Sequence, residues 1–174
     1  KVPHITIMGG AHHYNNPHSV CAEFNIMVDP DAADIVCDFG VPFTMVTLEA
    51  CLGEAKLNEQ MIHSMRQKGP IGNFCVDCNA TMIKNHKQQY GKEAFDLPDP
   101  VTIAVLSRPE MIKTKLEAYT RVETKGEFTR GATIFANANK QHGEGFGYPY
   151  RPVNSTIVTE VSPEQFHQYI LDCM

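Results

Sequence analysis

The polar residues between positions 11 and 25 have the types and the spacing needed to hold a sugar. Asn16, Glu23 and Asn25 place one carboxylate and two amides within ten residues, with no lysine or arginine among them. Carboxylate and amide oxygens accept hydrogen bonds from sugar hydroxyls, and amide nitrogens donate in return. A phosphate ligand would need basic side chains or a glycine-rich helix start. The segment favours a neutral, hydroxyl-rich ligand, although a plain polar loop before a helix explains the same residues.

Two strands and a glycine turn must position these side chains. Residues 4–8 (HITIM) predict a short strand that stops at Gly9 and Gly10. Residues 43–48 (FTMVTL) form a continuous apolar run, which is typical of a strand covered on both faces. A helix between them, reached by short links, predicts that the two strands are parallel neighbours. In open α/β sheets ligands bind beyond the carboxyl ends of the strands, where the polar segment begins.

The rest of the chain also has an α/β pattern. Asp29 and Pro30 predict the cap and first residue of a helix that runs to about Asp38 and ends near Gly40. Ser162-Pro163-Glu164-Gln165 predicts a capped final helix. Further helices are expected at 57–67, 74–90 and 99–106, and further strands at 116–123, 132–136 and 155–160, the first two of these joined as a hairpin. Residues 1–174 therefore predict one mostly parallel open sheet flanked by helices.

Composition narrows the class of partner. The formal net charge of −5 and the pI near 5.9 argue against a nucleic-acid partner or an anionic membrane surface. No apolar run reaches the roughly 18 residues that span a bilayer, and no signal peptide precedes the first strand. Because Lys1 is not methionine, we expect residues upstream of it.

The spacing of the six cysteines does not match that of a disulfide framework. They favour reduced, buried thiols and hence a cytoplasmic protein, with secretion as the alternative. Cys75 and Cys78 form a lone C-x-x-C, for which zinc binding has little support because no second ligand pair has convincing spacing.

Several segments in the same order resemble the inosine–uridine-preferring nucleoside hydrolase family. They are Met8-Gly-Gly-Ala, Ala22-Glu-Phe-Asn-Ile, Asp29-Pro-Asp-Ala-Ala, Asp99-Pro-x-x-Ile-Ala-Val-Leu and Val122-Glu-Thr-x-Gly-Glu-Phe-Thr-Arg-Gly-Ala-Thr. The resemblance covers nearly the whole chain and corresponds to the C-terminal half of that family's single domain. It implies a nucleoside-hydrolase-like, Rossmann-like fold that lacks its N-terminal half.

The resemblance also implies an activity and a set of site residues. The activity is hydrolysis of the N-glycosidic bond of ribonucleosides to base and ribose by calcium-activated water. Glu23 and Asn25 match residues that hold the ribose hydroxyls, and Asp99 matches a carboxylate ligand of Ca²⁺. The remaining substrate-binding residues implied are Met8 beside the sugar, Phe24, and Asn16 or else Asn15. We expect the Glu23 side chain to face the ligand and to matter little for folding, and Asp99 to point into the same cleft.

Three departures from the family's pattern concern catalysis. The aspartate cluster D-x-D-x-x-x-D-D is absent, Pro98 replaces a histidine that protonates the leaving base, and Leu48-Glu49-Ala50-Cys51 replaces L-D-x-T. Either a missing N-terminal half or another copy completes the site, or the chain is an inactive structural or binding subunit of a larger assembly. Candidates for the missing acid are led by His142, with His12, His13 and ring stacking by Tyr148 or Tyr150 as alternatives.

Overall fold

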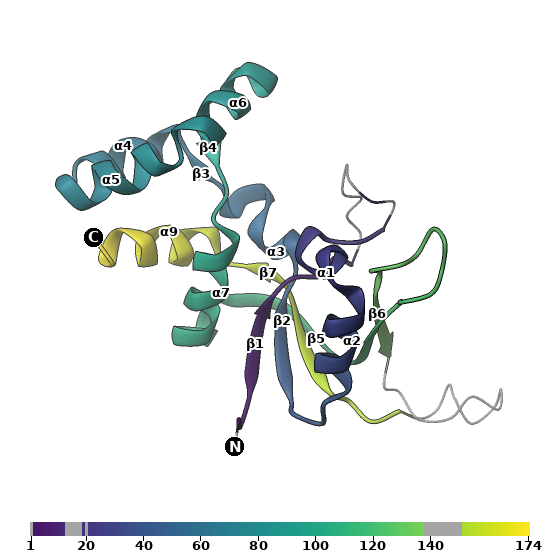
Figure 1. Ribbon diagram of the computed structural model, residues 1–174. Helices are drawn as coiled ribbons and strands as arrows, with labels where there is room; N and C mark the ends of the chain where they lie inside the picture. Colours follow the sequence, from purple (N-terminus) through teal and green to yellow (C-terminus); the bar gives the residue numbers. More distant parts are fainter. Residues whose placement is uncertain (1, 13–18, 20, 138–150) are drawn as a thin grey trace. The chain divides into compact units, whose positions relative to one another are not determined.

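The computed structural model describes residues 2–12, 19, 21–137 and 151–174 (Figure 1). The chain divides into two compact units, each described here by itself. Unit 1 consists of Lys1–Ala50 and Thr114–Glu160, and unit 2 of Cys51–Lys113 and Val161–Met174. The expectation that residues 1–174 are part of a single domain stays a prediction.

A five-stranded sheet forms the centre of unit 1. In spatial order its strands are β1 (Ile5–Met8), β2 (Phe43–Val46), β7 (Ser155–Val161), β5 (Ile112–Val122) and β6 (Thr133–Asn137). The predicted pairing of the first two strands is confirmed: β1 and β2 are parallel, with Ile5 opposite Phe43. β2 and β7 are also parallel, while β5 and β6 form the predicted antiparallel hairpin. The parallel strands bring their carboxyl ends to one edge of the sheet, where Met8 and Val46 lie opposite each other.

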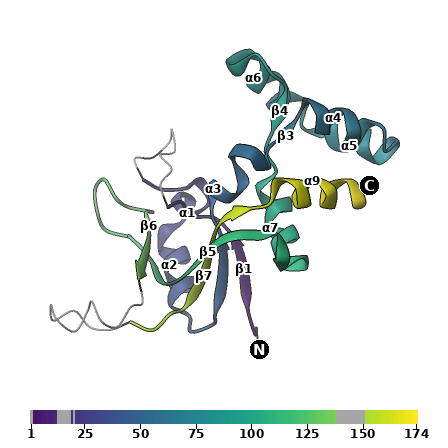
Figure 2. The ribbon, with the colours of Figure 1, turned by 180° about the vertical axis from the view of Figure 1, so that it is seen from behind.

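Two helices, α1 (Phe24–Val28) and α2 (Pro30–Asp38), pack on one face of this sheet (Figures 1 and 2). Ile26 and Cys37 of the helices join a buried core whose strand members are Phe43, Met45, Ala118, Val122 and Ile157. The start of α2 is as predicted, because the Asp29 carboxylate accepts a hydrogen bond from the Ala32 N–H at 3.0 Å. The predicted α/β class, a mostly parallel central sheet flanked by helices, is confirmed.

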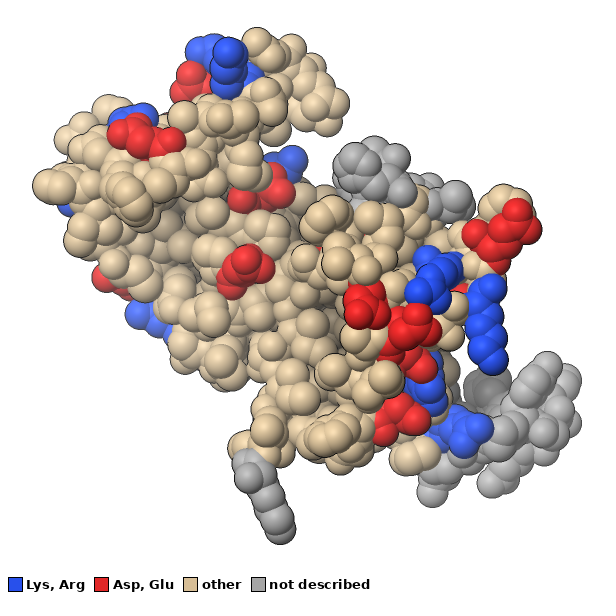
Figure 3. All heavy atoms as spheres, in the orientation of Figure 1, with Lys and Arg blue, Asp and Glu red and all other residues tan. Residues whose placement is uncertain are grey.

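An ion-pair network ties α2 to β5. The Asp34 carboxylate accepts from Arg121 Nε at 2.7 Å and from the Val122 backbone N–H at 3.0 Å. Asp38 pairs with the same guanidinium at 3.1 Å but is far more exposed. On the face seen in Figure 3, acidic and basic side chains accordingly lie next to one another over this part of unit 1. The hydrogen bond from Arg121 is the main reason that the pKa of Asp34 is lowered.

This lowered pKa predicts an acid-sensitive contribution to stability. A carboxyl whose pKa is lower in the folded state stabilises the fold above its unfolded pKa, about 3.9, and loses that effect as pH falls through the folded value. Asp34→Asn should cost about 1–2 kcal/mol at pH 7, a range kept low because Arg121 is partly solvated. The difference from wild type, measured by urea unfolding, should shrink at pH 2.5. Asp38→Asn is the matched control and should change little at either pH. A cost for Asp34→Asn that is equal at both pH values would contradict the assignment.

Unit 2 is mainly helical. After α3 (Leu48–Cys51), which leads into it, the unit contains η1 (Gly53–Ala55), β3 (Leu57–Asn58), α4 (Glu59–Arg66), α5 (Pro70–Cys78), α6 (Ala80–Tyr90), β4 (Ala94–Phe95), α7 (Pro98–Ser107), η2 (Pro109–Met111) and α9 (Pro163–Asp172). β3 and β4 form a short antiparallel pair. Among the described residues no helix is long and apolar enough to cross a membrane.

The predicted helix at 74–90 is wrong in its bounds, since two helices occupy this stretch. α5 begins earlier, at Pro70, because proline suits the first helical position and Gly69 provides a φ of +83° before it. It ends at Cys78, where the Asn79 side chain donates to the Cys75 carbonyl at 2.9 Å. The final helix begins as predicted, with Ser162 Oγ accepting from the Gln165 N–H at 3.3 Å.

Candidate functional site

The glycine turn after β1 fixes the backbone at the edge where the parallel strands end. Gly10 has a φ of +74°, and a Cβ there would lie 2.6 Å from Met45 Sδ. A Cβ on Gly9 would lie 3.2 Å from Ile26 Cδ1. The turn is tied to the end of β2, since Gly9 N–H donates to Val46 O at 3.1 Å and Leu48 N–H donates to Gly10 O at 3.0 Å. Glycine is therefore required at position 10 for its conformation as well as its small size.

The Glu23 carboxylate joins this turn to helix α1. Oε2 accepts from the Gly10 N–H at 3.2 Å, and both carboxylate oxygens accept from the Asn25 N–H at 3.0 Å. A longer bond of 3.4 Å joins the Ile26 N–H to Oε2. Glu23 is thus the N-cap of α1, and only 4% of its surface is exposed.

The expectation that Glu23 matters little for folding needs correction. The sequence places it in a polar segment, but its side chain contacts the glycine turn and is buried against backbone donors. A buried carboxylate that satisfies helix N–H groups stabilises the local fold. Among the described residues, the Asn25 N–H is the only backbone donor to its Oε1, so the carboxylate keeps acceptor capacity for a further donor.

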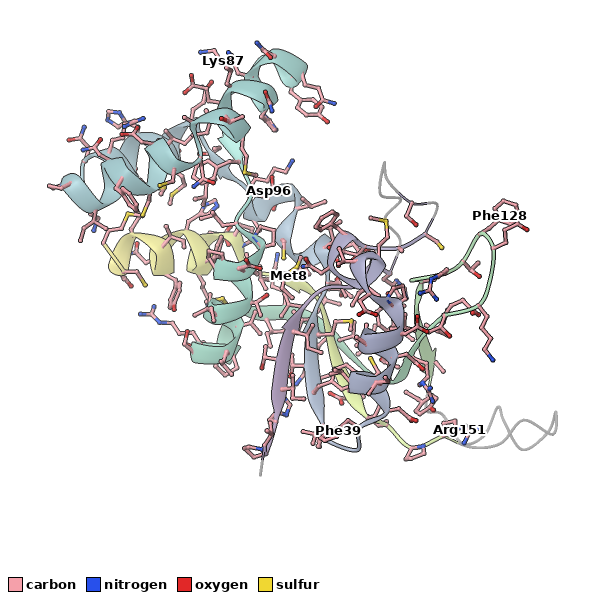
Figure 4. All side chains as sticks on the ribbon, viewed as in Figure 1. Met8, Phe39, Lys87, Asp96, Phe128 and Arg151 are labelled. Carbon is pink, nitrogen blue, oxygen red and sulfur yellow. The ribbon has the colours of Figure 1, made fainter. Side chains whose placement is uncertain are left out.

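Asn25 and Met8 lie together at the same edge of the sheet. The Asn25 amide nitrogen is 3.0 Å from Met8 Sδ and 3.4 Å from Met8 O. Figure 4 shows Met8 at the end of β1. Asn25 is exposed, as is the neighbouring Phe24, the first residue of α1. The structure therefore brings Met8, Glu23 and Asn25 into one cluster, with Phe24 beside it.

Two residues that the sequence did not predict as part of the site form hydrogen bonds with the backbone just after the glycine turn. Thr133 Oγ1 accepts from the Ala11 N–H at 3.1 Å and donates to the Ala11 carbonyl at 3.0 Å. Glu49 Oε1 accepts from the His12 N–H at 2.8 Å, and the His12 ring stacks on Phe135 at 5.8 Å between centroids. The only sequence signal for Thr133 is its place at the end of the Gly-Ala-Thr segment, which gives no hint of a contact 122 residues away.

Asp99 lies in unit 2, in the first turn of α7, where its side chain is exposed. It is not the N-cap, since Leu97 takes that position and Pro98 is the first helical residue. The Pro98 carbonyl accepts from Thr102 Oγ1 at 3.2 Å, and the Cys51 thiol lies 3.9 Å from the same oxygen. The predicted shared cleft of Asp99 and Glu23 stays a prediction, because the two residues belong to different units.

Some predicted site residues lie outside the described residues. These are Asn15 and Asn16 of the ribose loop, together with the acid candidates His13, His142, Tyr148 and Tyr150.

The residues in the described part of the chain do not form a metal site by themselves. Within the described ranges, no group of three or more His, Cys, Asp or Glu side chains could hold a metal ion. Calcium takes six to eight oxygen ligands, so an exposed Asp99 supplies at most a small share of them.

Known proteins with the same sequence pattern and fold are nucleoside hydrolases. The family model for inosine-uridine preferring nucleoside hydrolase matches residues 1–168. The pyrimidine-specific ribonucleoside hydrolase RihA of Salmonella gallinarum (strain 287/91 / NCTC 13346) is 34% identical over 172 residues, which cover 95% of this chain and 50% of the relative.

Solved structures show the same coverage. The purine-preferring ribonucleoside hydrolase from Gardnerella vaginalis superposes with a TM-score of 0.74 at 26% identity, over 97% of this chain and 50% of that one. An inosine-guanosine nucleoside hydrolase gives a TM-score of 0.80 at 23% identity, over 95% of this chain and 49% of that one, and supports the fold alone. The chain spans about half the length of the relatives it matches. On the family model and the curated relative together, this chain belongs to the inosine-uridine preferring nucleoside hydrolase family.

Proposed function

We propose that this chain is the sugar-binding half of an enzyme that hydrolyses the N-glycosidic bond of ribonucleosides to free base and ribose. The observation that carries the proposal is the Met8, Glu23 and Asn25 cluster at the carboxyl ends of β1 and β2. It offers amide and carboxylate groups beside an apolar thioether, which suits ribose hydroxyls and the sugar face.

The residues of the cluster have distinct roles in this proposal. Asn25 exchanges hydrogen bonds with a ribose hydroxyl, and Met8 packs against the ring. The Glu23 carboxylate accepts from a second hydroxyl through Oε1 while its backbone bonds hold it in place. As the glycosidic bond breaks, the sugar becomes oxocarbenium-like, and a fixed carboxylate stabilises the positive charge that develops.

A direct test uses a chimera in which this chain replaces the matched half of the Salmonella relative. We expect the chimera to release ribose from nucleosides in a reducing-sugar assay. Because the relatives' names differ in the preferred base, pyrimidine and purine nucleosides are both assayed. A folded chimera that binds nucleoside without releasing ribose would favour the inactive binding subunit.

We further propose that a segment outside this chain pairs with β1. Within the described residues β1 forms an edge of the sheet and pairs only with β2. Its four residues are only half-buried, and Val28, Ile35 and Phe39 of the adjoining helices and their ends are exposed. A hollow of about 350 Å³ lies here, lined by Ile7, Met8, Val36 and others.

An apolar strand edge of this kind favours pairing with a further segment or a second copy. Sedimentation of the chain alone and of the chimera distinguishes these partners. If the chain alone self-associates and the chimera does not, the result supports pairing of β1 with a further segment. The free cysteines support a reducing, cytoplasmic location for the assembled protein.

Calcium binding should depend on residues beyond this chain. We propose that Asp99 supplies one ligand of a calcium ion and that the other ligands come from elsewhere. Titration calorimetry of the 174-residue protein should therefore detect no tight Ca²⁺ binding, whereas the chimera should bind Ca²⁺ and lose affinity on Asp99→Ala. Tight binding by the chain alone would mean that it contains a complete ligand set.

A further inference from the structure

Unit 2 contains an apolar pocket of about 310 Å³, which is within the size range of small-ligand sites. One wall is a single face of α5, where Ile71, Phe74, Cys75 and Cys78 follow the i, i+3, i+4, i+7 spacing. Buried side chains, among them Met65 and Phe95, form its interior.

Three thiols line this pocket, from Cys75 and Cys78 on α5 and from Cys173 at the end of α9. Cys78 and Cys173 are exposed, whereas Cys75 is half-buried. Cys37 in unit 1 is different: burial, and then the nearby Asp34, raise the pKa of its thiol to about 11. The pocket thiols are therefore accessible to a ligand in a way that Cys37 is not.

The arrangement argues against two common uses of neighbouring cysteines. Residues three apart on a helix have Cβ atoms about 5–6 Å apart, whereas a disulfide needs about 3.5–4.5 Å. The α5 pair thus cannot close a disulfide without distorting the helix. In the described part of the chain, the three thiols also do not form a group that could hold a metal ion. All three are free thiols in the structure.

We propose that this pocket binds small apolar α,β-unsaturated carbonyl compounds and that the Cys78 thiol adds to them covalently. The apolar wall holds the carbon skeleton, and the exposed thiol of the same helix face reaches the double bond. Asn79, which also lines the pocket, uses one amide N–H for the Cys75 carbonyl and keeps a second N–H to polarise the ligand's carbonyl.

The step balances without an oxidant or a reductant. The Cys78 thiol loses its proton to water, and the thiolate sulfur forms a bond to the β-carbon of the ligand. The π-electron pair of the double bond moves toward the carbonyl, and the resulting enolate takes a proton from water at the α-carbon. The net change is addition of S–H across C=C, which leaves a thioether.

Two maleimides of similar intrinsic reactivity test the proposal on the whole protein. N-cyclohexylmaleimide is apolar and N-(2-carboxyethyl)maleimide is charged, and peptide mass spectrometry follows labelling at each cysteine. Relative to glutathione as the reference thiol, Cys78 should prefer the apolar reagent by about tenfold, which corresponds to about 60 Å² of apolar surface leaving water. Cys37 should remain unlabelled in the folded protein.

Matched variants separate the pocket from general surface effects. Ile71→Ser removes an apolar side chain from the pocket wall, whereas Ile103→Ser removes one from α7 outside the pocket lining. Both isoleucines are 56% exposed, so both variants should fold. The apolar preference at Cys78 should fall toward the glutathione value in the first variant and persist in the second. Three results would overturn the proposal. The first is a wild-type preference at Cys78 equal to that of glutathione, and the second is an equal loss of preference in both variants. The third is the same apolar preference at Cys75 or Cys173 with none at Cys78.

Discussion

Glu23→Ala should destabilise the protein by about 2–4 kcal/mol and abolish nucleoside binding in the assembled enzyme. The carboxylate receives hydrogen bonds from three backbone N–H groups, those of Gly10, Asn25 and Ile26. Alanine leaves these donors without this acceptor in a buried setting, where each unsatisfied group costs about 1–3 kcal/mol before relaxation. Urea unfolding of wild type and variant measures the loss of stability.

The matched control for this prediction is Asn25→Ala, in the first turn of the short helix that Glu23 caps. Asn25 is exposed, and within the described residues its side-chain amide forms hydrogen bonds only with Met8. Its removal should change stability by less than about 0.5 kcal/mol while it weakens sugar binding. Glu23→Gln should lie between the two, since an amide keeps one acceptor oxygen but turns a donor toward N–H groups. Equal stability of Glu23→Ala and Asn25→Ala would show that the Glu23 bonds contribute nothing to the fold.

Local rules predicted most of the first βαβ unit. Alternation of apolar runs with Asp29, Pro30 and Gly40 is enough to place β1, α2 and β2, because caps and turn residues act over three or four positions. The same rules joined α5 and α6 into one helix, since no proline or glycine separates them at Asn79. There Asn79 leaves helical geometry, with φ −99° and ψ 10°, and its side chain donates to the Cys75 carbonyl, a local detail that composition does not encode.

The site was predicted by residue type but not by environment. The structure brings Met8, Glu23 and Asn25 together at one strand end, as their place beside the glycine turn suggests, while their role in binding stays a prediction. The burial of Glu23 depends on a contact between residues 13 positions apart. The hydrogen bond between Thr133 and Ala11 joins residues 122 positions apart. Long-range packing of this kind has no periodic signature in one sequence.

Pro98→His should raise kcat for inosine by about 10²–10⁴-fold in the chimera, if the chain otherwise retains the family's chemistry. The resemblance puts a base-protonating histidine directly before the residue matched by Asp99, and a proline side chain has no proton to give. The substitution fits the fold, because position 98 is the first residue of α7 and Pro98 contacts Thr102 and Cys51 through its carbonyl, which histidine also has. A first-turn N–H needs no intrahelical partner.

Substrates with different leaving groups distinguish proton donation by a histidine at position 98 from an effect of the substitution on helix geometry. A nucleoside analogue with a nitrophenyl leaving group needs no proton, so its kcat should stay nearly constant in Pro98→His. Pro98→Ala removes the ring without adding an acid and should leave both substrates close to the Pro98 value. Equal gains on the two substrates, or equal gains for histidine and alanine, would mean that position 98 acts through helix geometry. No gain in an active chimera would point to an acid already present elsewhere, and His142→Ala should then lower kcat for inosine alone.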